Sequence, residues 1–188
     1  SLISEIKVGT TVATNALLEG KGAKTVLVVT KGFEDQLRIG YQNRPDIFSR
    51  KITLPNQLYE KVIGVDERIL SDGKIITELD NFKLKIELSK CLKNGITSCA
   101  ILLMHGYKYI NHEKKISKLA QSLGFDQVSA SHEISPQIRF VERGDTTVLD
   151  AYLTPILKTY IEQLVQNFSG NLGHKLKFMQ SNGGLISK

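Results

Sequence analysis

The sequence is poor in the residues that build disulfide frameworks and membrane anchors. Only two cysteines, Cys91 and Cys99, occur among its 188 residues, and they do not form a C-x-x-C pair. We therefore expect two reduced thiols in the cytoplasm rather than a disulfide scaffold. The apolar runs are short, such as residues 26–29 and 100–104, so no segment is predicted to span a membrane.

Signatures of several catalytic classes are also missing. The sequence has no G-x-S-x-G elbow for a serine nucleophile and no Walker A sequence for a nucleotide phosphate. Its four histidines lack the spacing of metal ligands, and its acidic residues near position 70 match no calcium loop. We therefore predict no metal site and interpret Asp66, Glu67 and Asp72 as exposed hairpin charges.

Acidic residues are scarce in one part of the chain. The net charge is +6, and residues 83–118 hold eight lysines against only Glu87 and Glu113. A nucleic-acid surface would need arginines and stacking aromatic side chains among the lysines, and only Tyr107 and Tyr109 occur there. We predict a solvated lysine face on two surface helices and no nucleic-acid partner.

What the sequence does contain is an alternation of strand and helix patterns, which is typical of an α/β fold. The predicted strands are residues 3–8, 25–30, 98–107, 127–130 and 176–179, and the predicted helices are residues 32–39, 79–93, 111–123 and 146–168. Ser71-Asp72-Gly73 predicts a β-hairpin over residues 61–76. Pro155 predicts a kink or break in the last helix.

The turn Gly9-Thr10-Thr11 comes between a predicted strand and a further short helix. Gly9 would allow a sharp turn, and either threonine can cap the helix. Backbone N–H groups and hydroxyls at this point suit an anion or a polarised carbonyl, and Asn15 is included in the candidate site. An ordinary capped helix explains the same spacing, and both interpretations stay open. One face of this helix is predicted to pack on the sheet through Val12, Ala13, Ala16 and Leu17.

Polar groups follow the predicted strands in a repeated pattern. They are Thr10 and Thr11, Lys31, His105, residues 131–133, and Gln180, Ser181, Asn182, Gly183 and Gly184. If the strands are parallel, all five groups project from one edge of the sheet, where ligands of α/β proteins collect. Such a set of hydroxyls, amides and glycine backbone would hold a phosphate or a polar ring. For His105 a structural role is the alternative.

Arg44 is a further candidate because Pro45 keeps it out of helical geometry. Its guanidinium would then be presented from extended backbone, where it could bind a carboxylate or phosphate. A structural ion pair with Asp46 or Glu34 would explain the arginine equally well.

Five segments, taken together and in order, resemble the hydantoinase A/5-oxoprolinase family, which includes N-methylhydantoinases and acetone carboxylase-like proteins. They are residues 9–24, Thr30-Lys31-Gly32-Phe33-Glu34-Asp35, Gln42-Asn43-Arg44-Pro45-Asp46, residues 131–136, and residues 179–185. The resemblance implies a ribonuclease-H-like, actin-like ATPase lobe, with a mixed sheet and helices on both faces, in truncated form. The family usually has His before Gly-Thr-Thr, where this chain has Val8.

The resemblance also implies a function, while the catalytic residues stay unknown. We expect part of an ATP-dependent hydrolase that opens a cyclic amide after phosphorylating its carbonyl, with ATP and Mg needed by the full-length protein. A second subunit of the hydantoinase B type would be a partner. The alternative is a non-catalytic ligand-binding or scaffold subunit of a related carboxylase complex.

The family's Asp-x-Gly-Gly-Thr phosphate motifs are absent from this sequence. We therefore expect a piece of a longer protein that binds no cofactor by itself. Residues 1–140 would belong to the N-terminal hydantoinase/oxoprolinase domain without its first phosphate motif. Residues 141–188 would supply the long helix and the first strand and turn of the following hydantoinase A domain.

Overall fold

The computed structural model describes residues 5–42, 48, 54, 56–167, 176–179 and 185–187. The chain divides into two compact units, Ala23–Tyr152 on the one hand and Ser1–Gly22 with Leu153–Lys188 on the other. We call them the central unit and the terminal unit, and each is described by itself.

The central unit is built on four parallel strands in the order β3-β2-β6-β7. These strands are β2 (Thr25–Thr30), β3 (Lys61–Val65), β6 (Ser98–Leu102) and β7 (Gln127–Ala130). Every residue of β2 and β6 is buried, as expected for the middle strands of a parallel sheet covered on both faces. The strand predicted over residues 98–107 is shorter in the structure: β6 ends at Leu102, and a turn follows.

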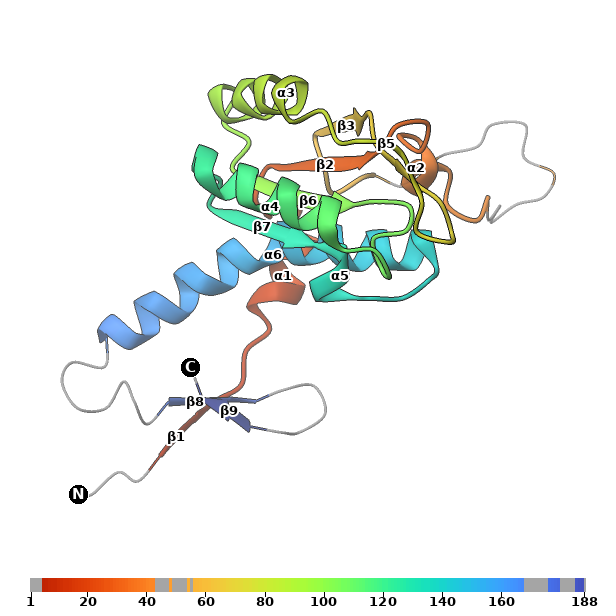
Figure 1. The fold of residues 1–188 in the computed structure, drawn as a ribbon. Coiled ribbons are helices and arrows are strands. Elements are labelled where there is room, and N and C mark those ends of the chain that lie inside the picture. The colour runs from red at the N-terminus through yellow and green to blue at the C-terminus, as the bar shows by residue number, and fades with distance from the viewer. Residues whose placement is uncertain are drawn as a thin grey trace. The chain divides into compact units, whose positions relative to one another are not determined.

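Helices cover both faces of this sheet (Figure 1). On one face, Val26, Val28 and Ile101 pack in a core with α3 (Asn81–Lys93) and α4 (Asn111–Leu123). On the other face, Leu27 and Leu102 pack with α2 (Gln36–Ile39) and the first half of α6 (Phe140–Asn167). Alternate residues of each strand thus enter opposite cores, because side chains alternate across a strand. The short helix α5 (Ser131–Ile134) directly follows β7.

The hairpin predicted over residues 61–76 is wrong in its first strand. Residues 61–65 form β3, which pairs in parallel with β2, because the apolar side chains of Ile63 and Val65 are buried in the main core. The hairpin itself joins β4 (Arg68–Ile69) to β5 (Ile75–Thr77). Its turn is the predicted one, and Gly73 adopts a φ of 94° that favours glycine.

The last long helix begins earlier than predicted. α6 begins at Phe140 instead of residue 146, and it continues through Pro155 as one helix, so Pro155 does not break it. Proline removes the N–H that would bond to the carbonyl of Ala151, and the hydroxyl of Ser98 donates to that carbonyl instead. A hydrogen bond from the sheet therefore replaces the missing one. No helix in the described part of the chain is long and apolar enough to cross a membrane.

The terminal unit has a three-stranded sheet in the order β1-β8-β9. β1 (Ile6–Val8) and β8 (Leu176–Met179) are parallel, and β9 (Leu185–Ser187), which the sequence pattern did not predict, is antiparallel to β8. In α1 (Val12–Leu18) only Ala16 is buried. Of the predicted packing face, Val12 and Ala13 are half-buried and Ala16 is buried, whereas Leu17 is exposed.

The close packing of α6 on the central sheet depends on Gly144. A Cβ atom at this position would lie 2.5 Å from a methyl of Leu37 and 2.6 Å from a methyl of Leu102. We predict that Gly144→Ala lowers the free energy of unfolding by about 1–3 kcal/mol, because overpacking outweighs the gain in helix propensity.

Urea denaturation monitored by circular dichroism measures this change. Thr146→Ala is the matched control, because Thr146 is an exposed neighbour on the same helix, and its effect should stay within about 0.5 kcal/mol. A Gly144→Ala variant as stable as the original protein would contradict the packing described.

Candidate functional site

Polar groups follow the strands of both sheets, but they do not share one edge. Lys31, His105 and Ser131 follow β2, β6 and β7 and lie at the carboxyl edge of the parallel central sheet. Thr10 and Thr11 follow β1, which belongs to the other sheet, as does β8, after which residues 180–184 come. The expectation of a single edge for all five groups is therefore wrong, because the strands form two separate sheets.

Glu113, in the first turn of α4, is the centre of the polar network at the central edge. Its side chain is fully buried. One carboxylate oxygen accepts hydrogen bonds from the N–H of Leu103 at 2.9 Å and the hydroxyl of Ser131 at 2.6 Å. The other accepts from the N–H of His132 at 3.0 Å and lies 2.7 Å from Nδ1 of that histidine. One carboxylate thus joins the loop after β6 to the helix α5, and its acceptor capacity is satisfied.

Gly106 makes room for this carboxylate. A Cβ atom at position 106 would lie 2.1 Å from Oε1 of Glu113, so the buried, hydrogen-bonded carboxylate would have to move. The glycine after His105 is therefore needed for the close approach of the loop to α4.

Arg143 of α6 holds the same loop from the opposite face of the sheet. Its guanidinium is fully buried and donates to the carbonyls of Leu103 at 2.6 Å, Met104 at 3.1 Å and Gln137 at 2.9 Å. Burial lowers the pKa of Arg143, and the charge of Glu113 offsets part of this shift. Carbonyl dipoles and one nearby carboxylate thus compensate the buried cation in part.

Thr30, at the end of β2, adds a third attachment. Its hydroxyl accepts from the N–H of Met104 at 3.0 Å and donates to the carboxylate of Glu67. Glu67 is also 2.8 Å from Nδ1 of His112, and both side chains are buried. The prediction of an exposed hairpin charge is therefore wrong for Glu67, because a hydroxyl and an imidazole satisfy its carboxylate inside the protein.

His105 directly follows Leu103 and Met104, the two residues whose backbone these side chains bind. It is half-buried, and its Nδ1 is buried without a hydrogen-bond partner among the described residues. Its ring centroid lies 6.2 Å from that of Tyr107. Its Nδ1 is thus a shielded polar atom without a partner, which is uncommon in folded proteins.

The Gly9-Thr10-Thr11 turn differs from the expected cap. Thr11 occupies the N-cap position without a side-chain cap, and the hydroxyl of Thr10 accepts from the N–H of Val12 at 3.1 Å. The amide of Asn15 donates to the hydroxyl of Thr11 at 3.5 Å. Gly9 has no positive φ, and a Cβ there would meet nothing within 4 Å, so this turn does not require glycine.

The remaining predicted site residues lie outside the described part of the chain. These are Arg44 and residues 180–184, and their roles stay predictions. The pairing of β1 with β8 bears on residues 180–184. Because Val8 pairs with Phe178 in parallel strands, the segments that follow β1 and β8 leave from the same edge of that pair.

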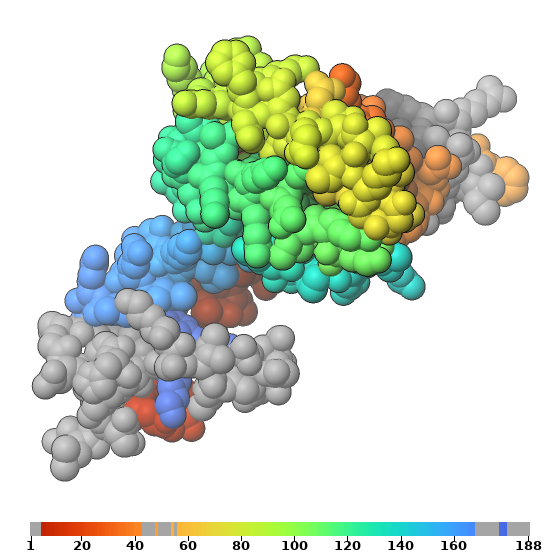
Figure 2. Space-filling model, viewed as in Figure 1, coloured from red at the N-terminus to blue at the C-terminus, as the bar shows by residue number. Residues whose placement is uncertain are grey.

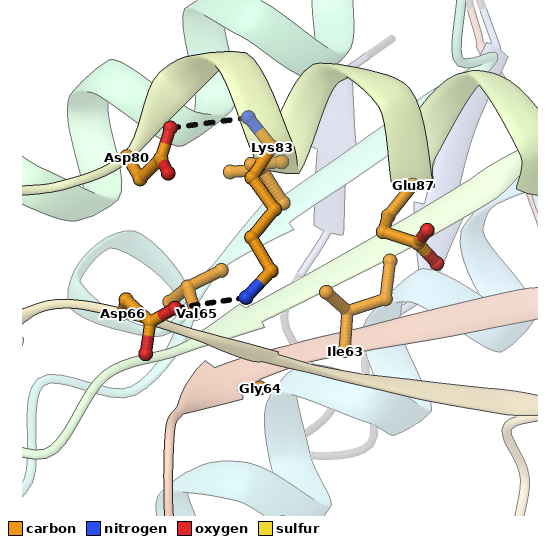
Figure 3. A pocket seen from close by; sticks show the side chains of 8 residues that line it. Ile63, Gly64, Val65, Asp66, Asp80, Lys83 and Glu87 are labelled. Carbon is orange, nitrogen blue, oxygen red and sulfur yellow. Dashed lines mark hydrogen bonds and ion pairs between the residues drawn. The ribbon is translucent and has the colours of Figure 1, made fainter.

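A small pocket lies between β3 and α3 (Figure 3). Its volume is about 20 Å³, far below the roughly 300–1,000 Å³ of ligand sites, so it does not fit a nucleotide or a lactam. Lys83 reaches across it to Asp66 at 3.0 Å. Glu87 lies 3.0 Å from Lys61 and 2.7 Å from Lys90. Among the residues that the structure describes, no group of His, Cys, Asp or Glu is arranged to hold a metal ion.

Comparison with known proteins identifies the family of this chain. Residues 1–124 match the model of the hydantoinase/oxoprolinase N-terminal region, and residues 143–188 match that of hydantoinase/oxoprolinase. The chain belongs to the hydantoinase/oxoprolinase family. It is 44% identical over 203 residues to 5-oxoprolinase 1 of Arabidopsis thaliana and 40% identical over 209 residues to 5-oxoprolinase of Dictyostelium discoideum. Each match covers 97% of this chain but only 16% of the relative.

Solved structures agree with this assignment. The chain is similar to the ATP-dependent caprolactamase of Pseudomonas jessenii with a TM-score of 0.83 and 32% identity, over 94% of this chain and 26% of that one. It also resembles nucleotide-free acetone carboxylase with a TM-score of 0.77, at 21% identity, which shows the fold alone. The predicted actin-like ATPase fold is confirmed.

In this hydantoinase/oxoprolinase chain, the sequence pattern missed the buried polar residues of the central unit. The sequence pattern places Glu113 among the acids of a lysine-rich surface, and Arg143 falls before the predicted helix of residues 146–168. Their only local signal is position: Glu113 stands in the first turn of α4, and Arg143 lies one residue before Gly144, which packs on the sheet.

The ion pairs at the pocket predict a pH dependence of stability. Hydrogen bonds from Lys90 and Lys61 lower the pKa of Glu87 from 4.5 to about 2. Stability from a carboxylate with a lowered pKa is fully present above the unfolded pKa and is lost as the pH falls through the folded pKa. Glu87→Gln should therefore cost less than about 1 kcal/mol near neutral pH, since the side chain is partly exposed.

The difference in the free energy of unfolding between the original protein and Glu87→Gln should become smaller as the pH falls from 4.5 towards 2. Urea denaturation of both proteins at about pH 7, 4 and 3, in low and high salt, measures it. Added salt should shrink the difference at neutral pH. A gap that stays constant with pH would show that the Glu87 ion pairs do not contribute.

Proposed function

We propose that the chain is part of an ATP-dependent hydrolase of cyclic amides, of the hydantoinase/5-oxoprolinase type. The observation that carries this proposal is the 34–44% identity to proteins named 5-oxoprolinase over at least 97% of the chain. The TM-score of 0.83 to an ATP-dependent caprolactamase supports it. Since the relatives are much longer, the activity would belong to a longer protein.

The proposed chemistry is activation of the lactam carbonyl. Transfer of the γ-phosphoryl group of ATP to the amide oxygen breaks its bond to the β-phosphate, releases ADP and makes the carbonyl carbon electrophilic. Water then attacks that carbon and loses a proton, the ring C–N bond breaks as the nitrogen takes up a proton, and phosphate leaves. Mg²⁺ would assist phosphoryl transfer. The described residues offer no cluster of carboxylates that fits this ion, so we assign it to other parts of the protein.

The proposed roles of this chain's residues are binding and orientation. Gly9, Thr10, Thr11 and Asn15, with residues 180–184, would bind the polar ring or a phosphate. The parallel pairing of β1 with β8 supports this grouping. His105 and Arg44 would each contact an oxygen of substrate or nucleotide.

The proposal also covers the domain boundaries and the subunits of the full-length protein. Residues 1–140 would form part of the N-terminal domain and residues 141–188 the start of the next. The two family matches, which end at residue 124 and begin at residue 143, support this boundary. A second subunit of the hydantoinase B type would complete the enzyme.

The proposal is tested on the full-length protein that contains this chain. We expect phosphate release from Mg-ATP to rise when 5-oxoproline, hydantoin or caprolactam is added, with one ring opened per ATP, because activation consumes a phosphoryl group. Assays of phosphate and of the ring-opened acid measure both products. Binding of a cyclic amide with no ATP turnover would instead favour the scaffold alternative.

The 188-residue chain alone should not turn over ATP. Phosphoryl transfer needs phosphate loops and a bound cation placed together, and the described residues offer no group for a cation. Isothermal titration with Mg-ATP and a phosphate-release assay on the purified chain measure this. Sustained turnover would show that a complete site lies within these residues.

A further inference from the structure

We propose that Thr30, Glu113 and Arg143 are positioning residues that fix the main chain leading into His105. They would thereby present the His105 ring to an oxygen of substrate or nucleotide. This inference rests on the proposed function. It assigns a role to three buried side chains that lie on different secondary-structure elements.

The three side chains bind consecutive peptide groups just beyond β6. Glu113 accepts the N–H of Leu103, and Arg143 donates to the carbonyls of Leu103 and Met104. Thr30 accepts the N–H of Met104. The backbone on the amino side of His105 is therefore bonded to β2, α4 and α6, whereas a loop at a sheet edge ordinarily bonds to water.

Each of these side chains is itself held in place. Thr30 donates to Glu67, which is bonded to His112. Glu113 is bonded to Ser131 and His132. Arg143 also donates to Gln137, and its guanidinium lies 5.4 Å from the ring centroid of Tyr107. Supporting bonds of this kind restrict a site to one geometry, as precise ligand contact requires.

Nε of Arg143 and Nε2 of His112 and His132 also lack a hydrogen bond among the described residues, but each of these side chains is bonded through another atom. The His105 ring makes no such bond to the described residues. All three side chains that hold the loop are fully buried, yet Nδ1 of His105 has no partner among the described residues. Leaving a buried polar atom unpaired has a free-energy cost. A loop fixed this firmly, whose histidine ring is left without a hydrogen bond to the described residues, fits ligand contact better than stability alone.

Thr30 offers the sharpest test, because Thr25 at the other end of β2 is an equally buried threonine. The Thr25 hydroxyl donates to the carbonyl of Ala23, away from the His105 loop. We would measure kcat/KM of the full-length protein for cyclic-amide-dependent ATP hydrolysis in Thr30→Val, Thr30→Ser and Thr25→Val. The same substitutions would be made in a His105→Ala background.

We expect Thr30→Val to lower kcat/KM by roughly tenfold to a hundredfold, the effect of a small misplacement. Thr30→Ser, which keeps the hydroxyl, and Thr25→Val should each stay within about threefold of the original protein. In the His105→Ala background Thr30→Val should cost no more than about twofold, because effects of coupled residues are not additive. Equal losses in both backgrounds, or an equal loss in Thr25→Val, would overturn the proposal.

A second readout separates this inference from the proposed function. In the 188-residue chain, amide exchange at Met104, measured by NMR, should be at least about tenfold faster in Thr30→Val than in the original protein. Exchange within β6 should not change in this variant, and exchange at Met104 should not change in Thr25→Val. Unchanged exchange at Met104, or faster exchange throughout the central unit, would refute the positioning role. A full-length protein that shows no ATP turnover with any cyclic amide, but the expected local exchange, would refute the proposed function and with it ligand contact by His105.

Discussion

The buried carboxylate of Glu113 is the interaction on which the carboxyl edge of the central sheet depends. Through four hydrogen bonds it joins the loop after β6 to the start of α5. It also provides the charge that offsets the buried guanidinium of Arg143. Removing a partner from such a buried set leaves donors or a charge uncompensated, which is far more costly than losing a surface ion pair. The geometry around Glu113 also explains why residue 106 is glycine.

The sheet that carries this edge is closely packed on both faces. β2 and β6 are buried along their whole length, and separate hydrophobic cores cover the two faces. Gly144 allows α6 to approach closely, and the hydroxyl of Ser98 takes over the hydrogen bond that Pro155 cannot make. Figure 2 shows the surface of the β4-β5 hairpin against that of the loop after β6, where Tyr109 donates to the carbonyl of Ser71.

The candidate residues are divided between two sheets. Thr10, Thr11 and Asn15 follow β1 in the terminal unit, whereas His105 follows β6 in the central unit. Their chemistry differs accordingly. The first group is exposed and offers hydroxyls and an amide near a helix start. His105 is half-buried on a loop that three buried side chains hold. Only the second group is fixed by interactions across the fold.

The sequence by itself determined the α/β class, the family, and those elements whose signals are local. β2, β7, α4 and its C-terminal glycine, Gly124, all follow from apolar periodicity and cap residues. Tertiary structure alone decided that residues 61–65 join the main sheet and that Glu67, Glu113 and Arg143 are buried. The reason is that a charged residue can be buried only when distant residues satisfy it. Thr30 is 37 residues from Glu67, and Leu103 is 40 residues from Arg143, separations that no local pattern records.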